Sequence, residues 1–199
     1  MTRTTPGKAR GKVTRGPSPG PNRTLGLILA GLTALVIVAI ALFAVFSASG
    51  GDSGNFIPND GGLIPVGEQA PPFTARTVDG GNVSVGGGES QTTMLVFFAT
   101  WCPHCQKEAP VIRDLEEQYD GLRVVMAGID GEDDPAKVEA FVDEYGIEGP
   151  AVYEPSLGSE YNVSGYPTVY VLDGNGEVVG AHSGEAPRAV FEGWVEEAL

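Results

Sequence analysis

The sequence WCPHC, at residues 101–105, holds the side chains best suited to chemistry. Cys102 and Cys105 are the only cysteines of this 199-residue chain, and two residues separate them. If the segment opens a helix, Cys102 faces unpaired backbone N–H groups and the positive end of the helix dipole, which favour a thiolate over a thiol. A thiolate is the attacking form in disulfide exchange, and Cys105 lies one helical turn further along. We therefore expect Cys102 to be the nucleophile and Cys105 to resolve a mixed disulfide.

The two residues between the cysteines are expected to tune this dithiol. Pro103 suits and stiffens the first turn of a helix, where its missing N–H would be unpaired in any case. His104 can place a cation or an imidazole N–H beside the Cys102 thiolate. Since a stabilised thiolate favours the dithiol form, such a contact makes the disulfide a stronger oxidant.

Two other uses of the cysteine pair remain as alternatives. A purely structural disulfide would close a very short loop and would therefore stabilise the fold little. A metal site built from Cys102, Cys105 and His104 is short of ligands, although thiolates suit Cu(I) and a copper chaperone is the rival function. No Met-rich or His-rich segment surrounds the site. The favoured interpretation is disulfide exchange without a metal or another cofactor.

An apolar strand and a helix are expected to position the two cysteines. Residues 93–98 form a nearly continuous apolar run, which is typical of a strand buried on both faces. A helix is predicted from about residue 103 to residue 119, since its apolar residues recur at helical spacing. Residues 122–129 are predicted to form a second buried strand. The cysteines would then lie where the first strand ends and the helix begins.

The remaining pattern alternates between strands and helices. Asp134 followed by Pro135 indicates a second helix, with the aspartate as N-cap and the proline at the first helical position. The other predicted elements are strands at residues 73–78, 82–85, 168–172 and 177–181, and a last helix at residues 187–198. This order predicts an α/β domain with a mixed central sheet flanked by helices.

Charge divides the chain into segments. Residues 1–24 hold 6 of the 12 basic residues and no acidic one, which leaves 6 basic and 26 acidic residues and a charge of −20 for the rest. Residues 25–46 carry no charge. A helix of that length spans about 33 Å, enough to cross a bilayer core of about 30 Å. We predict a disordered basic tail, a transmembrane signal-anchor helix, a flexible linker at residues 47–65 and one domain at residues 66–199.

The excess of basic residues before the span predicts its orientation. The positive-inside rule places the tail in the cytoplasm and the domain outside it, as in a single-pass protein of the cell membrane. A cleaved signal peptide is the alternative, because residues 47–49 could form a cleavage site, but its apolar core would be only about 7–15 residues long. The acidic domain argues against nucleic-acid binding, which needs clustered Lys and Arg.

Three motifs together resemble a known family. The first is FFATWCPHC at residues 97–105, the second is VSGYPTVYVLD at residues 163–173, and the third is VGEQAPPF at residues 66–73. The first resembles the active-site strand and helix of the thioredoxin superfamily, and the second resembles its cis-proline segment and the hairpin that follows. The match is most similar to membrane-anchored thiol–disulfide oxidoreductases of the TlpA/ResA type. The resemblance implies a thioredoxin-like fold for most of residues 66–199.

The resemblance implies a role for each matching residue. Cys102 matches the exposed nucleophile and Cys105 the resolving thiol. Pro167 matches a cis-proline that faces the disulfide, and the backbone of Tyr166 would then pair with an extended substrate segment. Trp101 matches the aromatic residue beside the site.

Glu108 and Pro110 also have implied roles. Glu108 lies one turn after Cys105 and matches a partly buried acid that accepts or relays the proton of the resolving step, with a solvated helix residue as the alternative. Pro110 matches a proline that kinks the helix, with a helix boundary at Ala109 as the alternative. Val96 departs from the pattern, because typical cytoplasmic thioredoxins carry a buried aspartate there, so any acid role falls to Glu108.

The predicted function is an extracytoplasmic protein-disulfide oxidoreductase. It exchanges the Cys102–Cys105 dithiol or disulfide with cysteines of exported proteins. The TlpA/ResA resemblance implies a reductase of the cytochrome c maturation type, with apocytochrome c as a substrate and a membrane thiol–disulfide protein as the electron-transfer partner. The Pro-His dipeptide is instead similar to that of strongly oxidising disulfide-forming enzymes, so an oxidase is the alternative direction.

Three other features carry weaker expectations. Residues 130–134 are mostly acidic but lack the twelve-residue loop of a calcium site, and Asp134 is expected to be a helix cap. His182, on a late strand, is expected to be exposed rather than functional. Peroxide reduction is disfavoured, because Thr100 stands one position too close to Cys102 for the motif Pro-x-x-x-Thr-x-x-Cys.

Overall fold

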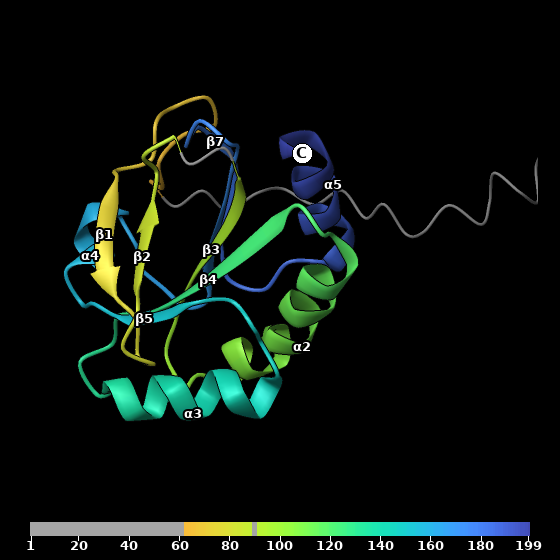
Figure 1. The fold of residues 1–199 in the computed structure, drawn as a ribbon. Helices are drawn as coiled ribbons and strands as arrows, with labels where there is room; N and C mark the ends of the chain where they lie inside the picture. The colour runs from red at the N-terminus through yellow and green to blue at the C-terminus, as the bar shows by residue number, and fades with distance from the viewer. Residues whose placement is uncertain (1–61, 89–90) are drawn as a thin grey trace, which may run out of the picture. The chain divides into compact units, whose positions relative to one another are not determined.

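The computed structural model describes residues 62–88 and 91–199 (Figure 1). The predicted basic tail, the predicted span at residues 25–46 and most of the predicted linker lie outside the described residues. Within the described part of the chain, no helix has both the length and the apolar character that a membrane crossing requires.

A five-stranded mixed sheet forms the centre of the domain. Strand β3 is parallel to β4 and antiparallel to β6, while β4 is parallel to β5 and β6 is antiparallel to β7, so the spatial order is β5-β4-β3-β6-β7. The strands are β3 (Thr92–Phe98), β4 (Leu122–Gly128), β5 (Ala151–Tyr153), β6 (Thr168–Leu172) and β7 (Val178–Ser183). Every residue of β3 is buried, as predicted for a strand covered on both faces.

Three helices cover one face of this sheet. They are α2 (Pro103–Gln118), α3 (Pro135–Tyr145) and α5 (Arg188–Ala198), and Figure 1 shows them together on one side of the strands. Successive side chains of a strand point to opposite faces, so alternate residues of β3 reach this layer. Met94, Val96 and Phe98 pack there with apolar side chains of all three helices.

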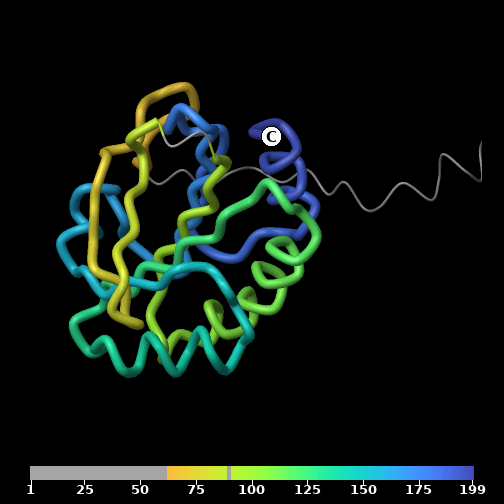
Figure 2. The backbone as a smooth tube through the Cα atoms, in the orientation of Figure 1, coloured from red at the N-terminus to blue at the C-terminus, as the bar shows by residue number. Residues whose placement is uncertain are grey.

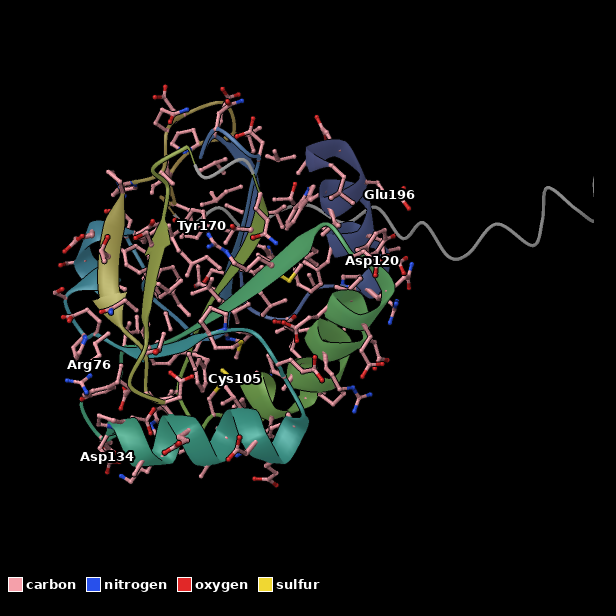
Figure 3. The ribbon with its side chains drawn as sticks, in the orientation of Figure 1. Arg76, Cys105, Asp120, Asp134, Tyr170 and Glu196 are labelled. Atoms are coloured by element: carbon pink, nitrogen blue, oxygen red, sulfur yellow. The ribbon has the colours of Figure 1, made fainter. Side chains whose placement is uncertain are left out.

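A hairpin and a short helix cover the other face. Strands β1 (Phe73–Arg76) and β2 (Asn82–Val85) pair antiparallel, and α4 comprises Leu157–Glu160. Leu95 and Phe97 of β3 pack into this second core. Tyr170, labelled in Figure 3, is fully buried here, and its hydroxyl donates to the carbonyl of Tyr161 at 2.6 Å. The buried phenol thus has the hydrogen-bond partner that its burial requires.

The first residues of the described domain lie along the edge of the sheet (Figure 2). The amide of Gly67 donates to the carbonyl of Val178 at 2.9 Å, and the amide of Val178 donates to the carbonyl of Glu68 at 2.9 Å. The amide of Ala70 donates to the carbonyl of Gly176, also at 2.9 Å. These bonds give the edge of β7 backbone partners near its start.

The predicted helix signals of α3 are confirmed. The Asp134 side chain accepts a hydrogen bond from the amide of Lys137 at 3.0 Å, and Pro135 occupies the first helical position. Gly146 ends the helix with φ of 68°, a left-handed conformation that glycine adopts without strain. In α2, the helix continues through Pro110, so the alternative of a boundary at Ala109 is wrong.

Two short elements were not predicted from the sequence. Strand β5 has three residues and α4 has four, so neither is long enough to produce a recognisable hydrophobic period. Strand β5 forms because β4 offers it a parallel partner, with Met126 opposite Ala151. Tertiary contacts rather than local pattern therefore specify this part of the fold.

Two glycines near α5 should respond to substitution in opposite ways. At Gly180 of β7, a new Cβ would lie 2.1 Å from Cδ2 of Trp194, and at Gly193 of α5 it would meet nothing within 4 Å. We expect Gly180→Ala to lower the free energy of unfolding by about 1–3 kcal/mol through overpacking. Gly193→Ala should raise it by about 0.5–1 kcal/mol, because alanine is the better helix former.

Urea unfolding of the full-length chain measures both effects, and Gly193→Ala serves as the matched control. Equal m-values would show that only stability has changed. A Gly180→Ala protein as stable as the wild type would contradict the close packing of Trp194 against β7.

Candidate active site

The end of β3 and the start of α2 place the two cysteines. Cys102 is the N-cap of α2, and its amide donates to the carbonyl of Ala99 at 3.1 Å, which closes the turn between strand and helix. Pro103 occupies the first helical turn, as predicted. Figure 3 shows Cys105 where α2 begins. The sequence thus places one thiol at the helix N-terminus and the other one turn inside it.

Cys102 is more covered than the sequence suggested. Both cysteines are free thiols, so the structure represents the dithiol form. Only 5% of Cys102 is exposed, and its Sγ lies 3.7 Å from the carbonyl oxygen of Tyr166. The expectation of an exposed nucleophile is therefore wrong for this form, because the segment before Pro167 packs over the thiol. A substrate disulfide must reach the sulfur beside that segment.

Cys105 is buried within the helix-covered core. Burial raises the pKa of its thiol, since a thiolate loses its hydration there, and a backbone hydrogen bond with Ala99 opposes the shift. Proximity to Cys102 and to Glu108 raises the pKa further. Cys105 therefore stays protonated until a base removes its proton.

The cis-proline segment faces Cys102. The peptide bond between Tyr166 and Pro167 is cis, as the resemblance implied. The Pro167 carbonyl accepts a hydrogen bond from the amide of Gly184 at 2.7 Å. Thr168 donates from Oγ1 to the carbonyl of Gly165 at 2.8 Å. These bonds hold the segment at the position where the Tyr166 carbonyl meets the nucleophilic thiol.

An aromatic pair lies beside the thiol. Trp101 is 52% exposed, and its ring meets that of Tyr166 edge to face with centroids 6.3 Å apart. Asp130 accepts from Nε1 of Trp101 at 3.1 Å and from the hydroxyl of Tyr166 at 3.4 Å. A hydrogen bond from the amide of Glu132 lowers the pKa of Asp130 most, and the bonds from Trp101 and Tyr166 lower it further. Asp130 thus orients both aromatic rings next to Cys102.

The acidic residues after β4 have local hydrogen-bonding roles. Asp133 is buried and accepts hydrogen bonds from Thr100, through the amide at 2.9 Å and through the hydroxyl. Asp130 orients the aromatic pair, and Asp134 caps α3. Residues 62–88 and 91–199 contain no group of three or more His, Cys, Asp or Glu side chains that could hold a metal ion.

Glu108 is buried, so the alternative of a solvated helix residue is wrong. Only 3% of it is exposed. Its Oε1 accepts from the amide of Ala186 at 3.0 Å, and its Oε2 has no hydrogen-bond partner among the described residues. Burial raises the pKa of Glu108 to about 7, and the hydrogen bond from the amide of Ala186 opposes only part of this rise. A carboxyl group with that pKa can accept and release a proton near neutral pH.

His104 has a partner that the sequence did not indicate. Its Nδ1 lies 2.5 Å from Oε1 of Glu185, in the segment between β7 and α5. Lys107 pairs with the other carboxylate oxygen of Glu185. The bonds from His104 and Lys107 hold the pKa of Glu185 below its usual value. Glu185 lies 81 residues from His104 in the chain, so no local pattern could have identified it.

His182 is buried rather than exposed, which corrects the expectation from the sequence. The residue lies on β7 opposite Val169, so it shares the sheet face that the helices cover. Its Nε2 lies 3.2 Å from the carbonyl oxygen of Glu185. Burial lowers the pKa of His182. His182 therefore packs against the backbone of the segment that carries Glu185.

A cavity of about 390 Å³ adjoins this part of the site. It lies between the first turns of α2 and the segment before α5. Its lining residues are Lys107, Glu108, Val111, Glu185, Ala186 and Pro187. Glu108 and the Lys107–Glu185 pair therefore line one recess.

The structure brings most of the predicted site residues together. Cys102 contacts the Tyr166 backbone that precedes cis-Pro167, and Trp101 packs on the Tyr166 ring. Cys105 and Glu108 interact electrostatically within α2. His104 is the exception, because its ring nitrogen faces Glu185.

Comparison with known proteins agrees with this geometry. Residues 66–181 match the AhpC/TSA family. The thioredoxin-like protein YneN of Bacillus subtilis (strain 168) is 33% identical over 132 residues, which cover 65% of this chain and 78% of YneN. The thiol-disulfide oxidoreductase ResA of Halalkalibacterium halodurans is 28% identical over 167 residues, which cover 83% of this chain and 91% of ResA.

A solved structure supports the same comparison. The thiol:disulfide interchange protein, thioredoxin family protein from Chlorobium tepidum TLS, superimposes with a TM-score of 0.60 at 28% identity. The match covers 68% of this chain and 98% of that protein. The expected thioredoxin-like α/β fold is therefore confirmed.

Burial of Glu108 should make stability depend on pH. Its pKa rises from an ordinary value of 4.5 to about 7 in the folded dithiol form. The folded state then binds more protons than the unfolded state between these values, so stability falls as pH rises through this window. Between pH 4.5 and pH 8, we expect the free energy of unfolding of the wild type to fall by up to about 3 kcal/mol relative to that of Glu108→Gln.

Urea unfolding of the reduced chain at a series of pH values measures this difference. The control is Glu139→Gln, which removes an exposed carboxylate from α3 and should keep the wild-type slope. Parallel pH curves for the wild type and Glu108→Gln would show that Glu108 ionises normally.

Proposed function

Because the chain belongs to the thioredoxin-like AhpC/TSA family, we propose that this thiol–disulfide oxidoreductase acts outside the cytoplasm on cysteines of exported proteins. The observation that carries the proposal is the position of Cys102. It occupies the N-cap position of α2, and its Sγ lies 3.7 Å from the backbone carbonyl before cis-Pro167. This geometry places a thiol and a backbone segment that could pair with a substrate at one point.

The first step transfers a disulfide bond. The Cys102 thiolate attacks one sulfur of a substrate disulfide, which forms a mixed disulfide and releases the other substrate sulfur as a thiolate. Cys102 stands at the N-terminus of α2, where the backbone N–H groups of the first turn have no partner within the helix. An extended substrate segment pairs with the backbone of Tyr166, and Trp101 offers an exposed apolar surface beside it.

The second step releases the substrate. The Cys105 thiol gives its proton to the Glu108 carboxylate and attacks Sγ of Cys102. The Cys102–Cys105 disulfide forms, and the second substrate sulfur leaves and takes up a proton. Two electrons thus pass from the protein dithiol to the substrate. Glu108 suits this role because it is buried near Cys105 and its pKa is about 7.

We propose that the chain runs in the reducing direction, as in cytochrome c maturation. The supporting observation is the similarity to a relative named ResA. Apocytochrome c carries Cys-x-x-Cys-His haem-attachment segments, and two cysteines at that spacing are a chemically suitable substrate. A membrane thiol–disulfide protein would return the active-site cysteines to the dithiol form.

The proposed location rests on the sequence. Six basic residues precede the uncharged residues 25–46, and this order favours an anchor with the domain on the extracytoplasmic side. Disulfide exchange between proteins is also common in such compartments, where cysteines are oxidised.

Trapping the intermediate tests the two cysteine roles. The probe is a synthetic peptide with an oxidised Cys-x-x-Cys-His segment. We expect Cys105→Ser to accumulate a mixed disulfide with the peptide, because the resolving thiol is absent. Cys102→Ser should form none and should reduce the peptide at the uncatalysed rate. Mass spectrometry of the full-length variants detects the adduct, and catalysis by Cys102→Ser would refute the nucleophile assignment.

The midpoint potential decides the direction of exchange. Equilibration of the full-length chain with glutathione buffers, followed by thiol labelling, gives the potential of the Cys102–Cys105 couple. We expect a value below about −230 mV, which suits a reductase. A value near about −120 mV, the range of strong oxidants, would overturn the reductase and support disulfide formation instead.

A further inference from the structure

The segment between β7 and α5 is fixed against the active site by its backbone. The amide of Gly184 donates to the Pro167 carbonyl at 2.7 Å, and the amide of Ala186 donates to Oε1 of Glu108 at 3.0 Å. The carbonyl of Glu185 lies 3.2 Å from Nε2 of the buried His182. One short segment thus contacts both the cis-proline and the buried acid.

The Glu185 side chain extends from this fixed backbone to the surface of α2. Its two carboxylate oxygens pair with His104, which is 66% exposed at its side chain, and with Lys107. His104 is one of the two residues between the cysteines. The carboxylate therefore holds a cation-forming side chain that could otherwise turn toward Cys102.

We infer that Glu185 is a positioning residue that sets the balance between the Cys102–Cys105 dithiol and disulfide by restraining His104. Its carboxylate engages the imidazole and places a negative charge beside it. Both effects weaken the stabilisation that His104 can give to the Cys102 thiolate. This inference rests on the proposed disulfide exchange and adds a residue that shifts the couple toward reduction of substrates.

The size of the expected effect is modest but measurable. Exposed ion pairs stabilise a fold little, so removal of the Glu185 carboxylate should leave the structure intact. A less stable thiolate makes the dithiol a better electron donor. A tenfold change in the equilibrium with glutathione needs only about 1.4 kcal/mol. For a two-electron couple, this change corresponds to about 30 mV.

A purely structural role for Glu185 predicts a different result. The backbone bonds of Gly184, Glu185 and Ala186 already fix the segment without the carboxylate. If the side chain only reinforced this attachment, its loss would alter stability and leave the redox equilibrium unchanged. The potential therefore separates the two roles.

Redox titration of four full-length proteins tests the inference. These are the wild type, Glu185→Gln, His104→Phe and the double variant. We expect Glu185→Gln to shift the equilibrium with glutathione about tenfold toward the dithiol, which makes the midpoint potential about 30 mV more oxidising. In the His104→Phe background, the same substitution should shift it less than threefold, because the imidazole is absent. Glu185→Asp should restore most of the wild-type value.

Two results would overturn the inference. One is an equilibrium constant of Glu185→Gln with glutathione within twofold of the wild-type value. The other is an equal shift of that constant with and without His104. Glu139→Gln, which removes an exposed carboxylate from α3, controls for net charge and should leave the equilibrium unchanged. Failure of the wild type to exchange disulfides at all would refute the proposed function, whereas normal exchange with unaltered variants would refute only the role of Glu185.

Discussion

The antiparallel pairing of β3 with β6 is the constraint on which the site depends. Phe97 lies opposite Thr168 in this pairing, and both strands lie at the centre of the sheet. Strand β3 ends at Phe98, one residue after Phe97, and the turn that follows leads to Cys102. On the other strand, Pro167 immediately precedes Thr168. The register therefore brings together a thiol and a carbonyl that are 64 residues apart in the chain. A slip of β6 by one residue would turn its side chains to the opposite faces of the sheet and separate the two groups.

The three ionisable groups Cys102, Cys105 and Glu108 follow one another along α2. Cys102 occupies the N-cap position of the helix, whereas one turn later Cys105 lies in the core with a raised pKa. Glu108 follows on the same side, buried and with one carboxylate oxygen unpaired among the described residues. Val96 of β3 is buried and apolar, and Glu108 is the carboxyl group that interacts with Cys105. The amide of Ala186 donates a hydrogen bond to Glu108, and this contact keeps the acid in place.

Local pattern predicted the parts of the fold that have a clear period or cap. The buried β3, the helix after Cys102 and the Asp134 cap were all apparent from the sequence. The residues that support the site were not, since Glu185 and Asp130 act through partners 29 to 81 residues away. His182 was placed on the correct strand but expected to be exposed, because a period of two does not reveal which face a neighbouring helix covers.

Both edges of the central sheet are paired by the first part of the described domain. Gln69 bridges to Glu177 next to β7, and Thr77 bridges to Val152 of β5. An uncovered edge is a template for any extended chain, and partly folded proteins are rich in such chains. Pairing at these positions shortens the free edge that such a chain could use. Under the proposed function, this pairing reduces non-productive capture of a substrate, and the backbone before cis-Pro167 is the place where strand-like pairing brings a substrate to the Cys102 sulfur.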